Sequence, residues 1–379
     1  MCFDHKKSLY FSVLLFVILL FAGYLLSQRK AIWNDEYFTQ QVSVDNVSYS
    51  DIMTGQFADG NRCPLFYIFQ NIVSDMFAFK LPLVNFKGSH LLLDQRSQII
   101  TRIPSNIYMS LALAGMFYFF LRFFSLSAAC YALLVAFISP MVWLYWVEAR
   151  PYSLWFLLTM AQLLLYCSTI LSPKIKINKP IYLTHFLLVL TTPGGIFQVL
   201  IISLMLFLKK RLKAYQLILA TLIPTIIFLI YYFLVPIFRI KTFFFFTILF
   251  EAVMPEHLLV YLIYAIAAWV LREKRKESSS NTFFLPIFLL FLLSGLFVLI
   301  THLYTRNFQF GLFNRYLVYL APADILMFTL AGIDLWRWSK KNIWVCTNLS
   351  ILLGGLIIIR GLLTYREIWS TALYLHSPG

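Results

Sequence analysis

Residues 9–39, LYFSVLLFVILLFAGYLLSQRKAIWNDEYFT, join a long apolar run to a pair of adjacent carboxylates. The run from Leu9 to Ser27 approaches the ~20 residues that an α-helix needs to cross a bilayer. Residues 5–7 (HKK) precede it and no small-x-small cleavage site follows clearly, so we expect an uncleaved anchor with a cytoplasmic N-terminus. Asp35 and Glu36 then lie just beyond the first membrane helix, at the membrane surface.

The composition places the chain among polytopic membrane proteins. Hydrophobic residues make up 61% of the 379 residues and charged residues only 12%, which is more apolar side chain than a soluble domain buries. The net charge of +15 fits basic cytoplasmic loops, so nucleic acid is not expected as a partner. The cysteines are scattered, with neither metal-ligand spacing nor a disulfide framework: Cys2, Cys63, Cys130, Cys167 and Cys346.

Apolar runs along the chain predict an all-α bundle of about eleven transmembrane helices. After the first run, the spanning candidates are Ile99–Leu121, Ala128–Val147, Tyr152–Leu171, Ala214–Val235, His257–Leu271, Phe283–Ile300, Tyr316–Leu335 and Trp344–Ile359. A further apolar stretch between Ile181 and Leu208 is broken by Pro193-Gly194-Gly195, and each half is too short to cross alone. We expect a pair of short helices there, because such a break is tolerated where the backbone lines a cavity or is covered by protein.

The segment Pro64–Phe79 decides which loops face which side of the membrane. It is apolar, but its polar residues lie roughly along one helical face, which favours a helix in the interface over a spanning one. The short basic clusters then become cytoplasmic, as the positive-inside rule favours: around Arg122 and at residues 174–179, 209–213, 272–276 and 337–341. Residues 28–98 form a long extracytoplasmic loop, and we expect residues 1–379 to be one domain without a separate soluble C-terminal domain.

The same topology gathers acidic residues and arginines at helix ends on the outer side of the membrane. A carboxylate such as Asp35 can take the proton of an acceptor hydroxyl as that hydroxyl attacks a sugar carbon. Arg150 and Arg315 are suited to hold a phosphate, because a guanidinium group donates two parallel hydrogen bonds and stays charged. Plainer alternatives stay open, with Glu36 as an ordinary surface carboxylate and the arginines as side chains that snorkel at helix ends.

Five segments, in the same order, resemble the membrane glycosyltransferases of the C-type (GT-C) fold, whose relatives include protein O-mannosyltransferases and the lipid A aminoarabinose transferase. WNDEYFT at 33–39 is similar to the family's Asp-Glu motif, and NRCPLFYIF at 61–69 to its His-Pro-Pro-Leu-Tyr segment. ITRIPSNIYMSLALAGMFYFFLRFF at 100–124 resembles its Arg-Leu-Pro-Ser helix. PMVWLYWVEARPYSLWFLL at 140–158 is similar to its Glu-Ala-Arg-Pro-Tyr junction, and NRYLVYLAPADILMFTLAGI at 314–333 to its late Arg-Tyr helix.

The resemblance implies transfer of a sugar from a polyprenyl-phosphate donor to a lipid, glycan or protein acceptor on the extracytoplasmic face. It places Asp35 and Glu36 in the catalytic centre, with Asp35 as the base. It assigns the donor phosphate to the two arginines and to the tyrosines beside them: Arg150, Tyr152, Arg315 and Tyr316.

The sequence departs from the family pattern and leaves a rival function open. Arg62-Cys63 replaces the family's histidine before the proline, so no metal is assigned, the cofactor is unknown and metal dependence stays open. The rival is a transporter or flippase of a lipid-linked saccharide, since broken helices and membrane charges also fit transporters. However, a transporter needs no Asp-Glu pair on a long outer loop, and the chain shows no repeated halves. A third possibility is a structural subunit of an envelope-assembly complex. The sequence determines neither the sugar nor the acceptor.

Overall fold

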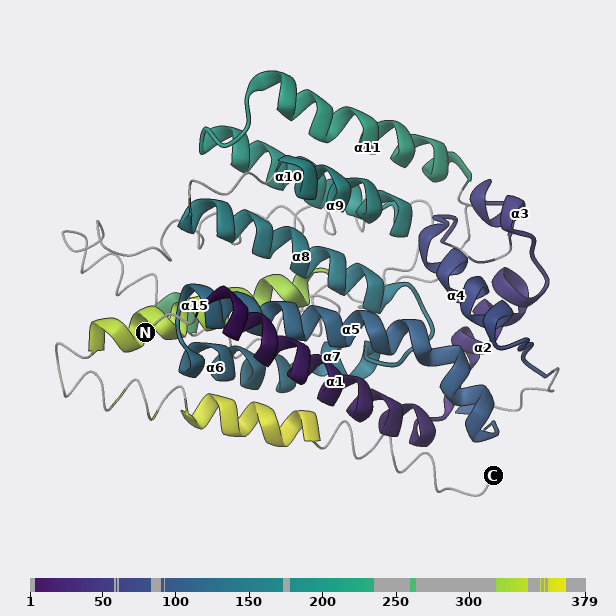
Figure 1. The fold of residues 1–379 in the computed structure, drawn as a ribbon, viewed down its shortest axis with the longest axis horizontal. Helices are drawn as coiled ribbons and strands as arrows, with labels where there is room; N and C mark the ends of the chain where they lie inside the picture. The colour runs from purple at the N-terminus through teal and green to yellow at the C-terminus, as the bar shows by residue number, and fades with distance from the viewer. Residues whose placement is uncertain are drawn as a thin grey trace, which may run out of the picture.

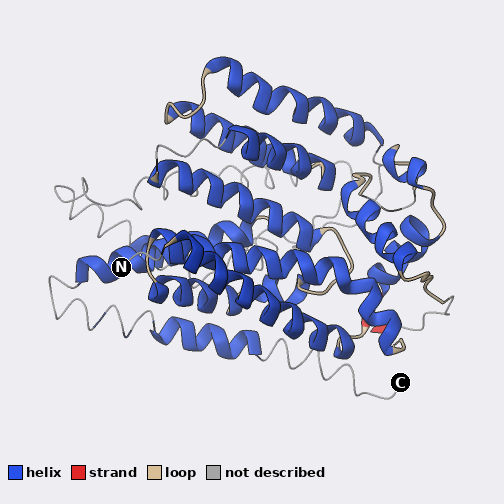
Figure 2. Ribbon diagram, viewed as in Figure 1, coloured by secondary structure: helices blue, strands red, loops and turns tan. Residues whose placement is uncertain are grey.

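A computed structural model describes residues 4–57, 59, 61–82, 90–91, 93–172, 178–234, 260–263, 318–339, 348, 351 and 354–365. These residues are almost entirely helical (Figures 1 and 2). The long helices are α1 (His5–Arg29), α5 (Gln95–Phe123), α8 (Tyr152–Leu171), α11 (Ala214–Leu234) and α15 (Leu320–Ser339). Shorter apolar helices are α6 (Leu126–Phe137), α7 (Pro140–Tyr145), α9 (Asn178–Thr191) and α10 (Gly195–Leu208).

The helices pack side by side as a membrane bundle with α5 and α8 at its centre (Figure 1). Within the described residues, four helices are long and apolar enough to cross a membrane: His5–Arg29, Gln95–Phe123, Tyr152–Leu171 and Ala214–Tyr231. The second and third of these bury most of their side chains, whereas α1 and α11 expose most of theirs. An apolar helix that exposes its side chains at the rim of a bundle is typical of contact with lipid. The predicted multi-pass membrane protein is therefore confirmed.

Most of the predicted spans that fall within the described residues are present as helices. The helix α8 has the predicted bounds. The helices α1, α5 and α11 each begin and end within four residues of their predicted bounds. The prediction of one helix over Ala128–Val147 was wrong, because α6 ends at Phe137 and α7 begins at Pro140. Proline fits the first turn of a helix but disrupts a helix interior. The predicted spans His257–Leu271 and Phe283–Ile300 lie wholly or largely outside the described residues, as does the first part of Trp344–Ile359.

The predicted pair of short helices is present as α9 and α10, which are joined through Thr192-Pro193-Gly194. Gly195 opens α10 so close to α9 that a Cβ atom there would lie 2.8 Å from the carbonyl oxygen of Leu188. Only glycine permits this approach without a shift of the backbone. The sharp return brings the end of α9 and the start of α10 to the same end of the bundle.

One end of the bundle carries the elements that follow α1, and we call it the loop end (Figure 1). These are β1 (Ile32–Trp33), α2 (Asn34–Gln40), the π-helix η1 (Gln41–Asp45), α3 (Tyr49–Met53) and α4 (Leu65–Met76). The strand β1 pairs antiparallel with β2 (His90–Leu91), drawn in red in Figure 2, with Ile32 opposite Leu91. Because α1 and α5 run antiparallel, the ring of His5 contacts Tyr118 near the opposite end of the bundle.

Several separate contacts identify the other segments that reach the loop end. The amide of Asn61 donates to the carbonyl of Thr191 at the end of α9 (2.8 Å). The hydroxyl of Tyr231, near the end of α11, donates to the carbonyl of Met53 (2.8 Å). Arg122 in the last turn of α5, the basic residues that follow α10, and Arg337 near the end of α15 lie at the opposite end. The Asp35-Glu36 pair and the Pro193-Gly194 break therefore share one end of the bundle.

The helix α4 lies within the predicted interfacial segment Pro64–Phe79 and has 12 residues, about 18 Å of helix. That length is well short of the ~30 Å hydrocarbon core. Its buried face carries the polar side chains of Gln70, Asn71 and Ser74, while Phe69, Ile72 and Met76 are exposed. An apolar exposed face on a short helix fits the predicted position in the membrane interface.

Candidate functional site

Asp35 and Glu36 occupy the first turn of α2, where carboxylates interact favourably with the positive end of the helix dipole. Glu36 also accepts a hydrogen bond from the backbone N–H of Trp33 (3.0 Å), which fixes the start of the helix. Successive helical residues are about 100° apart around the axis, so the two side chains point in different directions. Glu36 is fully buried, whereas Asp35 is partly exposed.

Glu36 forms a buried ion pair with Arg102 of α5, which we call the Glu36–Arg102 pair. Two parallel hydrogen bonds join the side chains, from Nε to Oε1 (3.0 Å) and from Nη2 to Oε2 (2.9 Å). The N–H of Ala149 adds a bond to Oε1 (2.8 Å). The remaining Arg102 donors bind backbone carbonyls at the end of α1 and just beyond it: Ser27, Lys30 and Ala31. All five N–H groups of Arg102 are thereby engaged.

The Glu36–Arg102 pair stabilises the charged carboxylate of Glu36. Burial alone raises the pKa of Glu36, because it removes water from the carboxylate. The charge and hydrogen bonds of Arg102, the charge of Lys30 and the N–H of Trp33 outweigh that effect and hold the pKa below its usual value. The pair thus joins α1, α2, α5 and the segment before α8 through charges that remain ionised.

A second arginine, Arg150, lies between α7 and α8 and also contacts α2. Its Nη1 donates to the carbonyl oxygen of Asp35 (3.2 Å), to the hydroxyl of Thr39 and to the carboxylate of Asp59 (3.3 Å). The Thr39 hydroxyl donates in turn to Asp59 (2.6 Å). We call this group the Arg150–Asp59 cluster. Asp35 and Thr39 are four residues apart and share one helical face, so one guanidinium group contacts both.

Tyr152, the first residue of α8, completes one side of the Arg150–Asp59 cluster. Its hydroxyl accepts a hydrogen bond from Nη2 of Arg150 (3.5 Å), and the guanidinium group lies 5.7 Å from its ring centre. Burial lowers the pKa of Arg150, but the neighbouring Tyr152 and Asp59 raise it, so the net pKa lies above its usual value. Arg150 therefore stays charged although it is buried.

The Arg150–Asp59 cluster retains an unused hydrogen-bond donor, unlike Arg102. The Nε of Arg150 is buried and has no hydrogen-bond partner among the described residues, and the buried hydroxyl of Tyr67 lies beside Asp59. The Nε of Arg62, whose guanidinium lies 5.6 Å from the ring centre of Phe57, is likewise buried and has no partner among these residues. Phe57 packs against Tyr67 at 4.6 Å, which connects Arg62 to the cluster. A buried donor without a protein partner is met by a water or by a ligand, so these N–H groups are candidates to bind an acceptor.

The structure brings together four of the six residues predicted for the site: Asp35, Glu36, Arg150 and Tyr152. Arg315 and Tyr316 lie outside the described residues. The described part of the chain just after them begins beside α8, because Tyr319 stacks on Trp155 at 5.1 Å.

Sequence reasoning missed three residues of the site. Arg102 stands within the Arg-x-Pro-Ser stretch of the resemblance, which offered a signal for it. Thr39 closes the WNDEYFT stretch, which likewise offered a signal, whereas Asp59 precedes a glycine in a polar loop, a pattern that usually indicates only a turn. Among the residues that the structure describes, no group of three or more His, Cys, Asp or Glu side chains could hold a metal ion.

Two crystal structures of ArnT from Cupriavidus metallidurans resemble this chain. The undecaprenyl phosphate complex aligns with a TM-score of 0.51 and 15% identity, and the apo state with a TM-score of 0.54 and 13% identity. Each alignment covers 96% of this chain and 74% of ArnT. An oligosaccharyltransferase from Archaeoglobus fulgidus aligns more weakly, with a TM-score of 0.43 and 12% identity over 91% of this chain and 53% of its own. No protein-family model and no curated protein matches the sequence. The fold of this chain is the ArnT-like GT-C fold.

Proposed function

We propose that the chain is a membrane glycosyltransferase that takes a sugar from a polyprenyl-phosphate donor. The observation that carries the proposal is the convergence of Arg150 on Asp35, with unused donors beside them. A buried cation with a free N–H, held at the backbone of the residue that carries a partly exposed carboxylate, suits a reaction in which a phosphate leaves and a hydroxyl loses a proton. The fold shared with ArnT, which was crystallised with undecaprenyl phosphate, supports a lipid-linked phosphate donor.

The donor phosphate, in this proposal, binds at the Arg150–Asp59 cluster. The free Nε of Arg150 is the donor offered to it, with Arg62 at the edge and Tyr152 against the guanidinium. Asp59 and Thr39 hold the other edge of Arg150, so the guanidinium is oriented before the phosphate arrives. Arg315 and Tyr316 are proposed on the sequence resemblance as further phosphate ligands.

Asp35 is the proposed general base. Its carboxylate removes the proton of the acceptor hydroxyl while the hydroxyl oxygen forms a bond to the anomeric carbon of the sugar. The bond from that carbon to the phosphate oxygen breaks, and polyprenyl phosphate leaves with the electron pair. Arg150 stabilises the negative charge that develops on the leaving phosphate. Direct displacement inverts the anomeric centre, a stereochemistry that rests on the family analogy.

Glu36 has a different proposed role from Asp35. Its two carboxylate oxygens accept four hydrogen bonds, from Arg102, Trp33 and Ala149, which occupies about all the lone pairs of a carboxylate. We assign it as a positioning residue. Through Trp33 it fixes the turn that bears Asp35, and through Ala149 it fixes the residue before Arg150.

The orientation in the membrane follows from the charges at the two ends of the bundle. The described basic loops lie opposite the loop end, and the positive-inside rule places such loops in the cytoplasm. The proposed site then faces the extracytoplasmic side of the cell (inner) membrane, and the N-terminus lies in the cytoplasm.

Mass spectrometry of envelope lipids and glycans from a deletion strain tests the proposed function. The expected result is an envelope species that is lighter by one sugar unit in the deletion strain. Wild-type protein is expected to restore the full mass, and an Asp35→Asn variant at matched expression is not. If the chain were a flippase, its deletion would instead cause a complete lipid-linked saccharide to accumulate on the inner leaflet. That accumulation, with unchanged glycan masses elsewhere, would contradict the proposal.

A further inference from the structure

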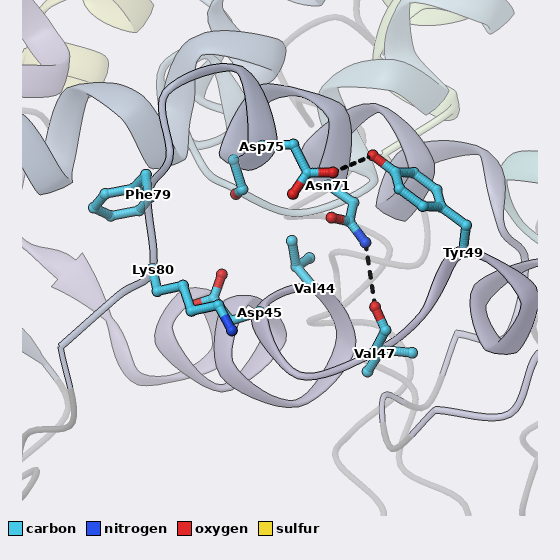
Figure 3. A pocket seen from close by; sticks show the side chains of 9 residues that line it. Val44, Asp45, Val47, Tyr49, Asn71, Asp75, Phe79 and Lys80 are labelled. Atoms are coloured by element: carbon cyan, nitrogen blue, oxygen red, sulfur yellow. Dashed lines mark hydrogen bonds between the residues drawn. The ribbon is translucent and has the colours of Figure 1, made fainter.

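A separate pocket of about 190 Å³ lies within the loop end, between η1, α3 and α4 (Figure 3). Residues of these elements and of the two flanking segments line it: Val44, Asp45, Val47, Tyr49, Asn71, Ser74, Asp75, Phe79 and Lys80. None of them belongs to the Arg150–Asp59 cluster. The volume is smaller than the roughly 300–1,000 Å³ of pockets for drug-sized ligands, so it suits one small ring or headgroup.

Hydrogen bonds with the protein hold the polar walls of the pocket in place. Asp45 accepts from the amide of Gln40 (2.6 Å) and from the N–H of Leu81 (2.8 Å). Asp75 accepts from the hydroxyl of Tyr49 (2.7 Å), and the Asn71 amide donates to the carbonyl of Val47 (3.3 Å), as Figure 3 shows. A carboxylate oxygen can accept two hydrogen bonds, and each of these oxygens accepts at most one from the residues just named. Both acids therefore retain acceptor capacity.

The walls favour a ligand rich in hydroxyl groups. Two carboxylates face a single ammonium group, that of Lys80, so the pocket is net acidic and disfavours a phosphate. Carboxylate and amide oxygens accept hydrogen bonds from hydroxyls, and the Ser74 hydroxyl and Lys80 donate to them. Tyr49 and Phe79 add aromatic surface to the lining, against which the C–H face of a sugar ring packs well.

The exposed face of α4 beside the pocket is apolar. Phe69, Ile72 and Met76 are 42%, 39% and 75% exposed, at the i, i+3, i+7 spacing of one helical face. Met76 directly follows Asp75 of the pocket wall. In a membrane protein such a face lies against acyl chains at the interface, which puts the pocket at the level of the lipid headgroups.

We propose that this pocket binds the saccharide headgroup of a membrane glycolipid, whose acyl chains lie along the exposed face of α4. That the glycolipid is the acceptor rests on the proposed function. Asp45 comes ten residues after Asp35, at the end of η1, so the two lie at most about 15 Å apart along the helix axis, because a π-helix rises less per residue than an α-helix. A headgroup that occupies the pocket and also reaches Asp35 therefore extends beyond one sugar ring.

The test is a lipid titration of the full-length protein in phosphatidylcholine nanodiscs, read by native mass spectrometry. The probes are glucosyl- and galactosyl-diacylglycerol, with phosphatidylglycerol as the anionic comparison. The expected result is saturable binding of at least one glycolipid in preference to phosphatidylglycerol.

Variants of the pocket lining sharpen the test. Asp75→Asn, which keeps an acceptor for Tyr49, is expected to weaken glycolipid binding about tenfold, as for one charge-assisted hydrogen bond. Val47→Phe, which fills the pocket without touching its charges, is expected to weaken binding similarly. Asp51→Asn on α3, a charge change outside the lining, serves as the matched control.

Three results would overturn the proposal: no saturable glycolipid binding, a preference for phosphatidylglycerol, or equal binding by all the variants. Undecaprenyl phosphate binding by the wild type in the same nanodiscs separates this inference from the proposed function. Glycolipid binding without undecaprenyl phosphate binding would count against the donor assignment and leave the pocket assignment intact. The reverse result would count against the pocket alone.

Discussion

Two buried arginines contact the same short helix, α2, and they differ in whether all of their N–H groups are engaged. All five N–H groups of Arg102 donate hydrogen bonds, to Glu36 and to backbone carbonyls. Arg150 bonds Asp59, Thr39, Tyr152 and the carbonyl of Asp35, yet its Nε has no partner among the described residues. A saturated arginine has no N–H left for a ligand, whereas one with a buried free donor can still bind one.

Removing Arg102 is expected to have the largest effect. Arg102→Ala leaves the Glu36 carboxylate buried without its cation, a change that costs about 3–5 kcal/mol in other buried pairs. We expect a large fall in the thermal midpoint of the purified protein and little folded material. Arg96→Ala, an exposed arginine on the same helix, is the control and is expected to leave the midpoint unchanged. A stable Arg102→Ala variant would remove the contrast between the two arginines.

Asp35→Asn is expected to abolish most activity without affecting the fold. The amide keeps the shape of the side chain but cannot accept a proton, and loss of a general base typically lowers rates about 10²–10⁴-fold. The measurement is the release of polyprenyl phosphate from the donor, with an envelope lipid extract as acceptor. Expression and thermal midpoint are matched to the wild type, and Asp51→Asn serves as the control. Release near the wild-type rate would exclude Asp35 as the base.

The pH dependence of stability offers a smaller test of the Glu36–Arg102 pair. The folded-state pKa of Glu36 lies below its unfolded value, so its stabilising contribution is complete above the unfolded pKa of about 4.3. That contribution is lost as the pH falls through the folded-state pKa. The difference in thermal midpoint between wild type and Glu36→Gln is therefore expected to be constant above about pH 5 and to shrink below it. A difference that grows on acidification would contradict the ion pair.

The sequence predicted the helices because apolar length and proline position are local properties. Tyr152–Leu171 was predicted with its bounds because Pro151 precedes the start and the apolar run is uninterrupted. The break between α9 and α10 followed from Pro193-Gly194-Gly195. The split between α6 and α7 also has a local signal at Pro140, which the continuous apolar run obscured.

The site was less predictable, because its partners are far apart in sequence. Glu36 and Arg102 are 66 residues apart, and Asp59 and Arg150 are 91 apart. The sequence grouped Asp35 with Glu36 because they are adjacent, but the helix turns the two side chains apart and only three-dimensional packing shows which one is engaged. The roles of all six predicted site residues stay predictions: Asp35, Glu36, Arg150, Tyr152, Arg315 and Tyr316.

The most direct test of a phosphate site at Arg150 is a titration of undecaprenyl phosphate against the protein in nanodiscs. Arg150→Lys keeps the positive charge but removes the planar fork and its Nε donor. Binding by Arg150→Lys is expected to be about tenfold weaker than wild type, or about 1.4 kcal/mol, with binding by Arg96→Lys unchanged. Superimposable curves for wild type and Arg150→Lys would show that Arg150 only snorkels at a helix end, and would contradict the proposed phosphate site.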